Sequence, residues 1–322
     1  MPDEYSIPDA LFLCKKSDTM QTMKKVQKLI TVVGPTASGK SDLAVMIARA
    51  VGGEVVSADS RQVYTDLDLG TGKITRKEMR GVPHHLLDVA SPKRTFTVAQ
   101  YKKLAERSIA DIIDRGNVPI LCGGTGFYVQ AIVDDLQIPN VPPNVPLRKT
   151  LSKKTVAELF AILTKLDPDR AYTIDAKNPV RLIRAIEIAQ ALGSVPKLPT
   201  KPADMYDMLI VGILPSDAEL RARIHKRLLA RMRQGMLAEA KRLHIQGLSW
   251  KRMEDLGLEY RYLARHLQGK LTKKEMLEEL ENAIWQYAKR QKTWFKRDKR
   301  IVWITPAELK KITPLATQFL KS

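Results

Sequence analysis

Residues 28–41 read KLITVVGPTASGKS, and they give the clearest indication of how this chain folds. Its first six residues form a short apolar, β-branched run, which is typical of a buried parallel strand. The next eight fit the pattern G-x-x-x-x-G-K-[ST], and residues 42–51, DLAVMIARAV, have the pattern of a helix. Strand, glycine-rich loop and helix are the context that this pattern requires. We call the eight residues the phosphate loop: Gly34, Pro35, Thr36, Ala37, Ser38, Gly39, Lys40 and Ser41.

The chemistry of the phosphate loop predicts a site for a diphosphate or a triphosphate. Its glycines let backbone N–H groups curl around an anionic oxygen, and the start of the following helix adds its dipole. Lys40 supplies a positive charge, and the Ser41 hydroxyl can hold Mg²⁺. The pattern does not distinguish ATP from another phosphorylated ligand, so it predicts diphosphate or nucleotide binding in general.

A second strand is expected at residues 54–58, and Asp59, Ser60, Arg61 and Gln62 follow it. In an open parallel sheet, ligands bind outside the carboxyl ends of the strands. Asp59 stands at such an end, so its carboxylate could accept a proton from a substrate or hold a metal-bound water. The alternative is that Asp59 caps a turn or a helix, as Asp-Ser pairs commonly do.

A third strand is expected at residues 118–122, and it runs into the glycine-rich segment 123–128, GGTGFY. Many phosphate-loop ATPases have an Asp at such a strand end, where it organises Mg²⁺ and water. No carboxylate occurs here, which argues against a motor or switch NTPase. The glycines suit the close approach of a bulky ligand to the backbone, and Thr125 can offer a hydroxyl. A tight strand-to-helix turn is the alternative.

Two clusters of proline, at 139–146 and 196–202, mark a crossing out of the sheet core and a return to it. Residues 153–193 between them are mostly helical in pattern, and Arg181 and Arg184 share one face of a helix. We therefore expect three parts: a flexible N-terminal extension at 1–26, an α/β core at 27–133 and 203–322, and a helical insertion at 134–202.

The rest of the core is expected to alternate strands with basic helices. The segments are a strand at 207–214, a long basic helical region at 217–245, a helical stretch at 272–295 and a last strand at 299–304. Together these features predict an α/β fold. Its core is a parallel sheet like that of the phosphate-loop nucleotide kinases, with a helical insertion domain and a basic helical C-terminal region.

Composition and charge limit the partners. The chain of 322 residues carries 54 Lys and Arg against 35 Asp and Glu, a net charge of +19, and residues 221–300 hold 22 against 9, or +13. An excess this large indicates a polyanionic partner. The two cysteines, Cys14 and Cys122, exclude a disulfide framework and a cysteine-based structural zinc site. The chain has neither a signal-peptide pattern nor an apolar run of membrane-spanning length, so we expect a soluble cytoplasmic protein without membrane contact.

Two functional classes are consistent with these residues alone. One is a transferase that uses a diphosphate-bearing small molecule and a nucleic acid. The other is a small-molecule or nucleotide kinase with an incidental basic surface. A nucleotide-gated RNA binder without catalysis is a weaker third class, because a binding switch needs a carboxylate that organises the metal. The missing strand-end carboxylate and the basic C-terminal region favour the transferase.

Seven motifs then occur in order along the chain: GPTASGKS (34–41), SADSRQVY (57–64), LGTGK (69–73), GVPHHLLDVASP (81–92), GGTGFYVQAI (123–132), NPVRLIRAIEI (178–188) and YAKRQKTWF (287–295). Together they closely resemble the bacterial type of the tRNA dimethylallyltransferases, also called tRNA isopentenyltransferases. The resemblance implies transfer of a dimethylallyl group from dimethylallyl diphosphate to N6 of the adenine just 3′ of the anticodon. It also implies Mg²⁺ as cofactor and an insertion that clasps the anticodon stem.

The resemblance also implies roles for matched residues. Asp59 would be the general base that contacts the adenine amine, and Thr125 would lie at the reaction channel and touch the tRNA. Arg227, within a matched R-I-x-x-R segment, would neutralise the leaving diphosphate, while Ser41 would hold the metal. The residues expected to contact tRNA are Asp59, Ser60, Arg61, Gln62, Thr125, Arg148, Arg181 and Arg184.

One segment departs from the family pattern. Residues 257–261 read GLEYR where many members have a G-Y-K/R-E/Q segment that touches tRNA, so those contacts are not carried over. Free-adenylate isopentenyltransferases share the phosphate loop and the Asp, but they lack the long insertion and the basic C-terminal region. We expect the tRNA-dependent activity, and a monomer.

Overall fold

The core of the protein is one parallel sheet. The computed structural model describes residues 26–196 and 205–322. Within these ranges, six strands pair in the order β3-β2-β4-β1-β5-β6, and every neighbouring pair is parallel. The strands are β1 (Gln27–Val33), β2 (Gly53–Ser57), β3 (His84–His85), β4 (Val118–Gly123), β5 (Tyr206–Ile213) and β6 (Val302–Ile304).

Helices follow the strands, fill the insertion and form the C-terminal region. Those that lie against the sheet or beside its edge are α1 (Lys40–Val51), α2 (Arg76–Met79), α3 (Val98–Asp114), α4 (Gly126–Val133), the 3₁₀ helix η1 (Pro306–Lys311) and α14 (Ile312–Lys321). The others are α5 (Val145–Leu151), α6 (Val156–Leu166), α7 (Pro168–Thr173), α8 (Pro179–Leu192), α9 (Asp217–Arg233), α10 (Met236–Ile245), α11 (Trp250–Leu256), α12 (Leu258–Leu267) and α13 (Lys273–Phe295).

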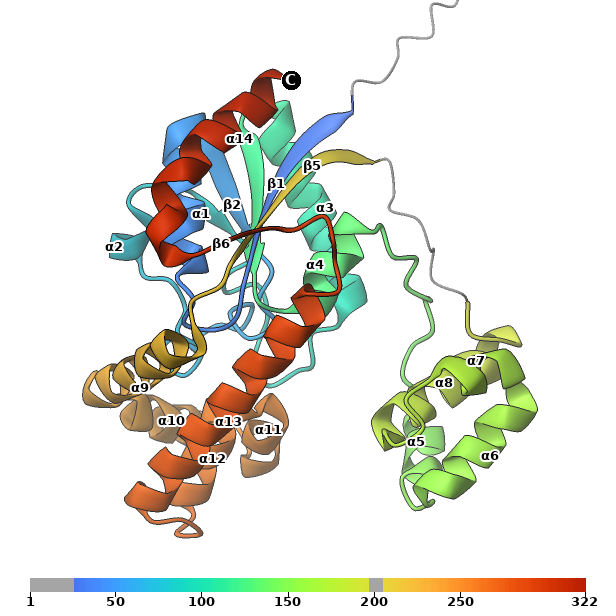
Figure 1. The fold of residues 1–322 in the computed structure, drawn as a ribbon. Coiled ribbons are helices and arrows are strands. Elements are labelled where there is room, and N and C mark those ends of the chain that lie inside the picture. The colour runs from blue at the N-terminus through green and yellow to red at the C-terminus, as the bar shows by residue number, and fades with distance from the viewer. Residues whose placement is uncertain (1–25, 197–204) are drawn as a thin grey trace, which may run out of the picture.

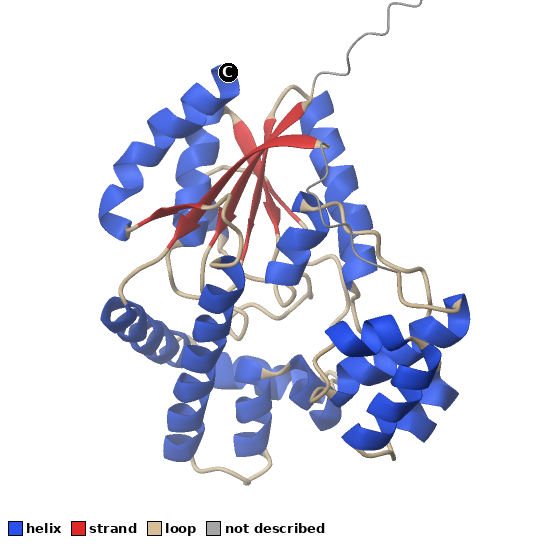
Figure 2. Ribbon diagram, turned by 45° about the vertical axis from the view of Figure 1, so that its right-hand side comes forward, coloured by secondary structure: helices blue, strands red, loops and turns tan. Residues whose placement is uncertain are grey.

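Both faces of the sheet are covered, as the apolar run before the phosphate loop predicts. Figures 1 and 2 show α1 and α14 on one face and α3 and α4 on the other. Successive side chains of a strand point to opposite faces. In β1, Ile30 and Val32 therefore join the cluster under α1 and α14, while Leu29 and Val33 join the cluster under α3 and α4. The predicted α/β fold is confirmed.

The strand order places three loops next to one another. Strands β2, β4 and β1 are neighbours in the sheet, and all three end at the same edge because they are parallel. Asp59 follows β2, the glycine-rich turn that we call the glycine turn (residues 123–126) follows β4, and the phosphate loop follows β1. The candidate residues that are separated in the sequence thus meet at one edge of the sheet.

Helices α5 to α8 have a hydrophobic cluster of their own. Leu159, Leu163, Leu182 and Ile186 are fully buried in it, and Figure 1 shows the four helices at the side of the sheet core. The structure describes this region up to residue 196, so the predicted boundary at 202 lies outside the described residues. Nearly all of the predicted N-terminal extension, residues 1–25, also lies outside them.

The C-terminal region contains a helix break that the prediction does not include. The long basic helical region expected at 217–245 consists of two helices, because α9 ends at Arg233 and α10 begins at Met236. Gly235 lies between them with φ +101°, a left-handed conformation that favours glycine and breaks the helix. The stretch expected at 272–295 is confirmed as α13. In the described part of the chain, no helix has the length and apolarity needed to cross a membrane.

Candidate active site

The phosphate loop forms a cradle at the end of β1. Gly39 is the N-cap residue of α1 with φ +99°, which an ordinary side chain would strain. Ala37 also has a positive φ, +61°. This backbone turns the N–H groups at the start of α1 toward the space above the sheet edge, where the helix dipole favours an anion. The local sequence therefore produces the backbone conformation that the predicted phosphate site requires.

A cavity of about 470 Å³ opens beside the phosphate loop. The loop forms one side of it, and three basic residues of α9 form the opposite side: Arg223, Lys226 and Arg227. Arg223 Nη1 donates a hydrogen bond to the Ser38 carbonyl oxygen at 2.9 Å, so α9 is fastened directly to the loop. Arg223 and Arg227 are four residues apart on α9, so they share one face of the helix, and that face points at the phosphate loop.

Two cations of this cavity, Lys40 and Arg227, are buried away from water. Burial lowers the pKa of Lys40, and the nearby charge of Asp59 partly counteracts that effect. Burial and then the charge of Arg231 lower the pKa of Arg227. Arg227 nevertheless stays protonated, since a guanidinium loses its proton only at very high pH. Both groups are poised to gain a negative partner, because such a partner offsets the cost of keeping their charges away from water.

Asp59 caps the turn after β2, and this leaves one of its carboxylate oxygens available for the predicted catalytic role. Its Oδ1 accepts hydrogen bonds from the backbone N–H of Arg61 at 2.9 Å and of Gln62 at 3.4 Å, so the carboxylate caps the turn after β2. Among the described residues, none donates a hydrogen bond to its Oδ2. One oxygen therefore holds the side chain in place while the other remains able to take a proton.

Thr125 fastens the glycine turn to the segment after β2. The Ser60 backbone N–H donates to its Oγ1 at 3.0 Å, and the Thr125 hydroxyl donates to Ser60 Oγ at 3.2 Å. Tyr287 of α13 lies close by, and burial raises the pKa of its phenol to about 12, so it is a neutral hydroxyl at physiological pH. Thr125 is thus brought to the centre of the candidate site, next to Asp59.

The glycines of the glycine turn lie in close contact with other parts of this chain. A Cβ on Gly123 would lie 2.1 Å from the Ala58 carbonyl oxygen, one on Gly124 would lie 2.4 Å from Gln291 Nε2, and one on Gly126 would lie 2.2 Å from the Trp294 ring. The glycines therefore allow parts of this chain to approach one another closely. The segment joins β4 to α4, so the alternative of a tight strand-to-helix turn is confirmed, and the approach of a bulky ligand stays a prediction.

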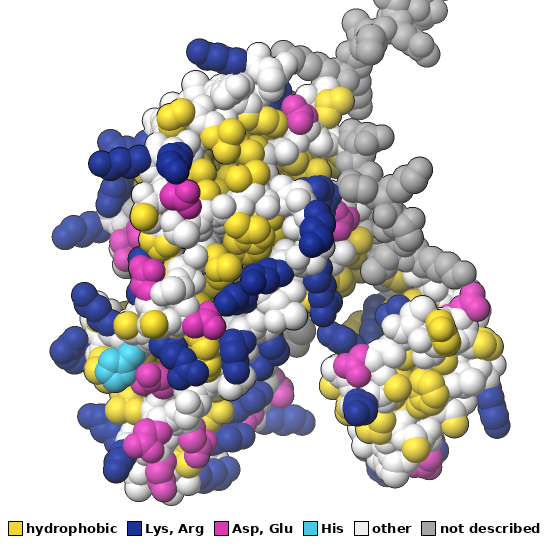
Figure 3. All heavy atoms as spheres, in the orientation of Figure 1, with side chains coloured by type: hydrophobic (Ala, Val, Ile, Leu, Met, Phe, Trp, Pro, Cys, Tyr) yellow, Lys and Arg dark blue, Asp and Glu magenta, His cyan; other side chains and the backbone are white. Residues whose placement is uncertain are grey.

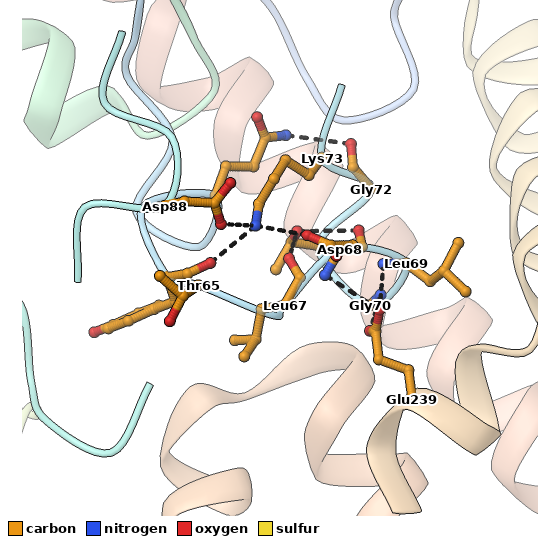
Figure 4. A network of polar contacts seen from close by, with 12 residues as sticks. Thr65, Leu67, Asp68, Leu69, Gly70, Gly72, Lys73, Asp88 and Glu239 are labelled. Atoms are coloured by element: carbon orange, nitrogen blue, oxygen red, sulfur yellow. Dashed lines mark hydrogen bonds and ion pairs between the residues drawn. The ribbon is translucent and has the colours of Figure 1, made fainter. Parts of the chain in front are cut away.

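A loop far from the phosphate loop in sequence completes the cavity. We call residues 67–73 the clamped loop, because two side chains hold it from opposite sides (Figure 4). Glu239 of α10 accepts hydrogen bonds from the backbone N–H groups of Asp68, Leu69 and Gly70. On the other side, the Lys73 ammonium binds the carboxylates of Asp68 and Asp88.

The clamped loop positions Arg227. Its Gly72 carbonyl oxygen accepts a hydrogen bond from Arg227 Nη2 at 2.9 Å and another from Gln62 Nε2 at 3.3 Å. A Cβ on Gly72 would lie 2.1 Å from Arg227 Nη2, and Gly72 has φ +58°. Gln62, expected to contact tRNA, therefore has a partner inside the site. Tyr260, from the divergent 257–261 segment, supports the clamped loop instead, because its hydroxyl donates a hydrogen bond to Glu239 Oε1 at 2.8 Å.

The arginines expected to bind tRNA through the insertion lie away from this cavity, and they differ in their partners. Arg148 makes two hydrogen bonds of 2.6 Å to the buried carboxylate of Glu187. Arg184 binds the same carboxylate at 3.2 Å and the Val141 carbonyl oxygen at 2.9 Å. Arg181 is the most exposed of the three, 59% for its side chain, and its nearest acid is Asp175 at 3.6 Å.

Sequence reasoning missed three residues of the site. The sequence places Arg223 in the basic helical region at 217–245 and predicts no site role for Gln291 or Glu239. Gln291 of α13 accepts a hydrogen bond from the Thr36 backbone N–H at 2.8 Å and donates one to the Gly124 carbonyl oxygen at 2.7 Å. Glu239 and Gln291 are polar residues on otherwise apolar helix faces, and this signal does not identify their partners. Arg223 lies among other charged residues of α9, so its pattern gives no such signal.

Comparisons with known proteins agree with this arrangement. The sequence profile described as IPP transferase matches residues 62–298. The chain is 40% identical over 285 residues to tRNA dimethylallyltransferase 2 of Citrifermentans bemidjiense, covering 87% of this chain and 90% of that protein.

Two solved structures extend the comparison. One is the full-length tRNA isopentenylpyrophosphate transferase from Bacillus halodurans, at 34% identity and a TM-score of 0.70, which covers 92% of this chain and 97% of that one. The other is a eukaryotic dimethylallyltransferase acting on tRNA, at 24% identity and a TM-score of 0.73, which covers 87% and 74% and supports the fold alone. The chain therefore belongs to the IPP transferase family, whose curated relatives are tRNA dimethylallyltransferases.

Proposed function

We propose that this protein transfers a dimethylallyl group from dimethylallyl diphosphate to N6 of the adenine 3′-adjacent to the anticodon of a tRNA. The observation that carries the proposal is the cavity between the phosphate loop and Arg223, Lys226 and Arg227. It offers an anion cradle and a set of cations facing it. Asp59, with one oxygen that accepts no hydrogen bond from the described residues, lies at the end of β2, which β4 separates from β1. The names of the curated relatives support the same reaction.

The phosphate side of the site accounts for departure of the leaving group. The bond between the allylic carbon and the diphosphate oxygen breaks, and the diphosphate takes the electron pair. Lys40, Arg223 and Arg227 stabilise the charge that develops on it, together with the N–H groups of the phosphate loop. The water-poor surroundings that lower the pKa values of Lys40 and Arg227 also strengthen this interaction.

The acceptor side accounts for bond formation. The adenine N6 attacks the allylic carbon, and the proton that N6 loses passes to Asp59 Oδ2. Asp59 is held by the backbone N–H groups of Arg61 and Gln62, so it does not have to reorganise to accept the proton. The adenine has to leave the stack of the anticodon loop to reach this position.

The residues at the phosphate site fit Mg²⁺. The ion commonly keeps several waters and binds through one or two protein oxygens plus substrate phosphates, without a dedicated cage of protein ligands. The Ser41 hydroxyl and the Asp42 carboxylate line the cavity and supply such oxygens. Cys122, near the strand end where ATPases often carry an Asp, offers a thiol rather than the oxygen ligand that Mg²⁺ prefers, and burial raises its pKa to about 12. When bound, Mg²⁺ would neutralise diphosphate charge.

The remaining surface fits an RNA acceptor. Lys and Arg side chains are spread over the C-terminal helices α9 to α13, and Asp and Glu are interspersed among them (Figure 3). Such a surface binds the phosphate backbone of RNA without reading its sequence. We infer that the insertion at 134–202 supplies the second side of a clasp on the anticodon stem-loop, and that Arg181 is its most available cation.

Mass spectrometry of tRNA nucleosides tests the proposal. The protein is incubated with dimethylallyl diphosphate, Mg²⁺ and tRNA that lacks the modification, and the digest is examined for N6-dimethylallyl adenosine. AMP replaces tRNA in a parallel reaction. Modified tRNA with little modified AMP is expected. Equal activity on AMP would favour a free-adenylate enzyme, and phosphoryl transfer from ATP without any prenyl transfer would favour a kinase.

A further inference from the structure

Gln291 connects two parts of the site that bind different substrates in the proposed reaction. It lies on α13 within one helix face that also carries Tyr287 and Trp294. Its side chain is buried, with 6% exposure. One end of its amide accepts the Thr36 N–H of the phosphate loop, and the other end donates to the Gly124 carbonyl oxygen of the glycine turn, with distances of 2.8 and 2.7 Å.

Each of these two bonds reaches a group that the reaction needs. Thr36 belongs to the loop that holds the diphosphate. Gly124 precedes Thr125, whose hydroxyl fastens the segment that carries Asp59. Gln291 is therefore the one side chain seen in the described residues to bridge the phosphate loop and the glycine turn by hydrogen bonds at both ends.

The surroundings leave Gln291 little freedom. Gly124 has no side chain, and a Cβ there would lie 2.4 Å from Gln291 Nε2, so the amide occupies that space. Further along α13, Trp294 lies against Gly126 in the same way and Phe295 is buried in the core. The bridge needs a donor and an acceptor on one side chain of this length, and glutamine supplies both.

We propose that Gln291 is a positioning residue that sets the distance between the diphosphate and the adenine acceptor, acting through Thr36 and Gly124. The inference rests on the proposed prenyl transfer, because it assigns the two loops to two substrates. Without the bridge, the phosphate loop still binds the diphosphate and Asp59 still faces the adenine, but the two substrates are no longer held at the right distance from each other. Transfer should therefore suffer more than the binding of either substrate.

Two variants and a matched control test this role. Gln291→Met keeps the length of the side chain and removes both hydrogen bonds. Gly124→Ala keeps Gln291 and displaces its amide, and Gly124 does not have a positive φ that alanine would strain. Gln286→Met makes the same change at an exposed position of α13. Urea unfolding of all three first establishes that each is folded at the assay temperature.

The expected result is a split between binding and transfer. In Gln291→Met, loss of the bond to Thr36 should weaken binding of pyrophosphate with Mg²⁺ by about 2- to 10-fold, measured by calorimetry. Loss of the bonds to both Thr36 and Gly124 in the same variant should lower kcat/KM for transfer by about 5- to 100-fold. The Kd for tRNA should change by less than about 2-fold, and Gln286→Met should match wild type. The double variant should be little worse than the poorer single one, because both changes remove the same bridge.

Several outcomes would overturn the inference. One is that Gln291→Met has the kcat and pyrophosphate affinity of wild type. Another is that the defects of the two single variants multiply in the double variant. A third is that both single variants fail to fold, which would assign Gln291 to core stability. Failure of the proposed function is recognisable separately, because then wild type itself would transfer no prenyl group. The pyrophosphate titration does not depend on that reaction.

Discussion

Replacing Glu239 with Gln should lower the free energy of unfolding and slow prenyl transfer, although Glu239 belongs to α10 and does not line the cavity. Its carboxylate is 6% exposed and accepts four hydrogen bonds. Oε2 takes the N–H groups of Asp68 and Leu69 at 3.2 and 2.8 Å. Oε1 takes the N–H of Gly70 at 2.9 Å and the Tyr260 hydroxyl at 2.8 Å.

The size of the effect follows from which bonds an amide can keep. Glutamine retains one acceptor oxygen, and its NH₂ group then faces the other pair of donors. The least costly arrangement directs the NH₂ group at the Tyr260 oxygen and leaves the Gly70 N–H without a partner. A buried donor left unsatisfied costs about 1–3 kcal/mol, so we expect the free energy of unfolding to fall by about that amount.

The same change should affect catalysis through Arg227. A displaced clamped loop moves the Gly72 carbonyl oxygen, which holds Arg227 Nη2. We expect kcat to fall about 10-fold, less than the roughly 10²- to 10³-fold loss from removing a charge-stabilising donor altogether.

Urea unfolding and steady-state transfer measure the two effects, and Glu278→Gln at an exposed position of α13 is the control for loss of one carboxylate. If the Glu239→Gln variant keeps both the unfolding midpoint and the kcat of wild type, then Glu239 does not hold the clamped loop.

The remaining predictions concern single side chains. Lys40→Ala should lower kcat by roughly 10²- to 10³-fold, because one group that stabilises the leaving diphosphate is lost; single-turnover kinetics measures this, and an unchanged rate would exclude Lys40 from the chemistry. Asp59→Asn should lower kcat by roughly 10²- to 10⁴-fold with nearly unchanged tRNA affinity; a collapse of tRNA binding with kcat retained would make Asp59 structural. Arg148→Met should lower stability by about 1–3 kcal/mol, because it leaves the buried carboxylate of Glu187 poorly paired. Arg181→Met should leave stability unchanged but reduce the slope of log K for tRNA against log salt by about 0.7–0.9; the opposite pattern would reverse the two assignments. Finally, burial pushes the pKa of Glu187 up, but hydrogen bonds from Arg148, Asn144 and Arg184 outweigh it and hold the pKa below its ordinary value. Its stabilising contribution should therefore be present above about pH 4.3 and disappear as pH falls through the lowered pKa; acid unfolding curves should lose this dependence in Glu187→Gln.

The sequence alone predicts the parts of this protein that depend on neighbouring residues. The strand, phosphate loop and helix at 28–51 are recognisable because strand burial, glycine conformation and helix initiation are all local. Asp59 and Thr125 are placed near the phosphate loop by a general rule, since parallel strands end at one edge of the sheet. The ordered motifs extend this to the family, which the comparisons confirm.

Tertiary structure decided which polar side chains serve the site and which serve the fold. Gln291 and Thr36 are 255 positions apart, and Glu239 and Gly70 are 169 apart, so no local pattern relates them. Arg148 and Arg181 look alike in sequence, but the buried carboxylate of Glu187 lies within reach of Arg148. The physical reason is that a hydrogen bond or ion pair depends on distance and burial. Packing of helices against a sheet sets both, and spacing along the chain does not.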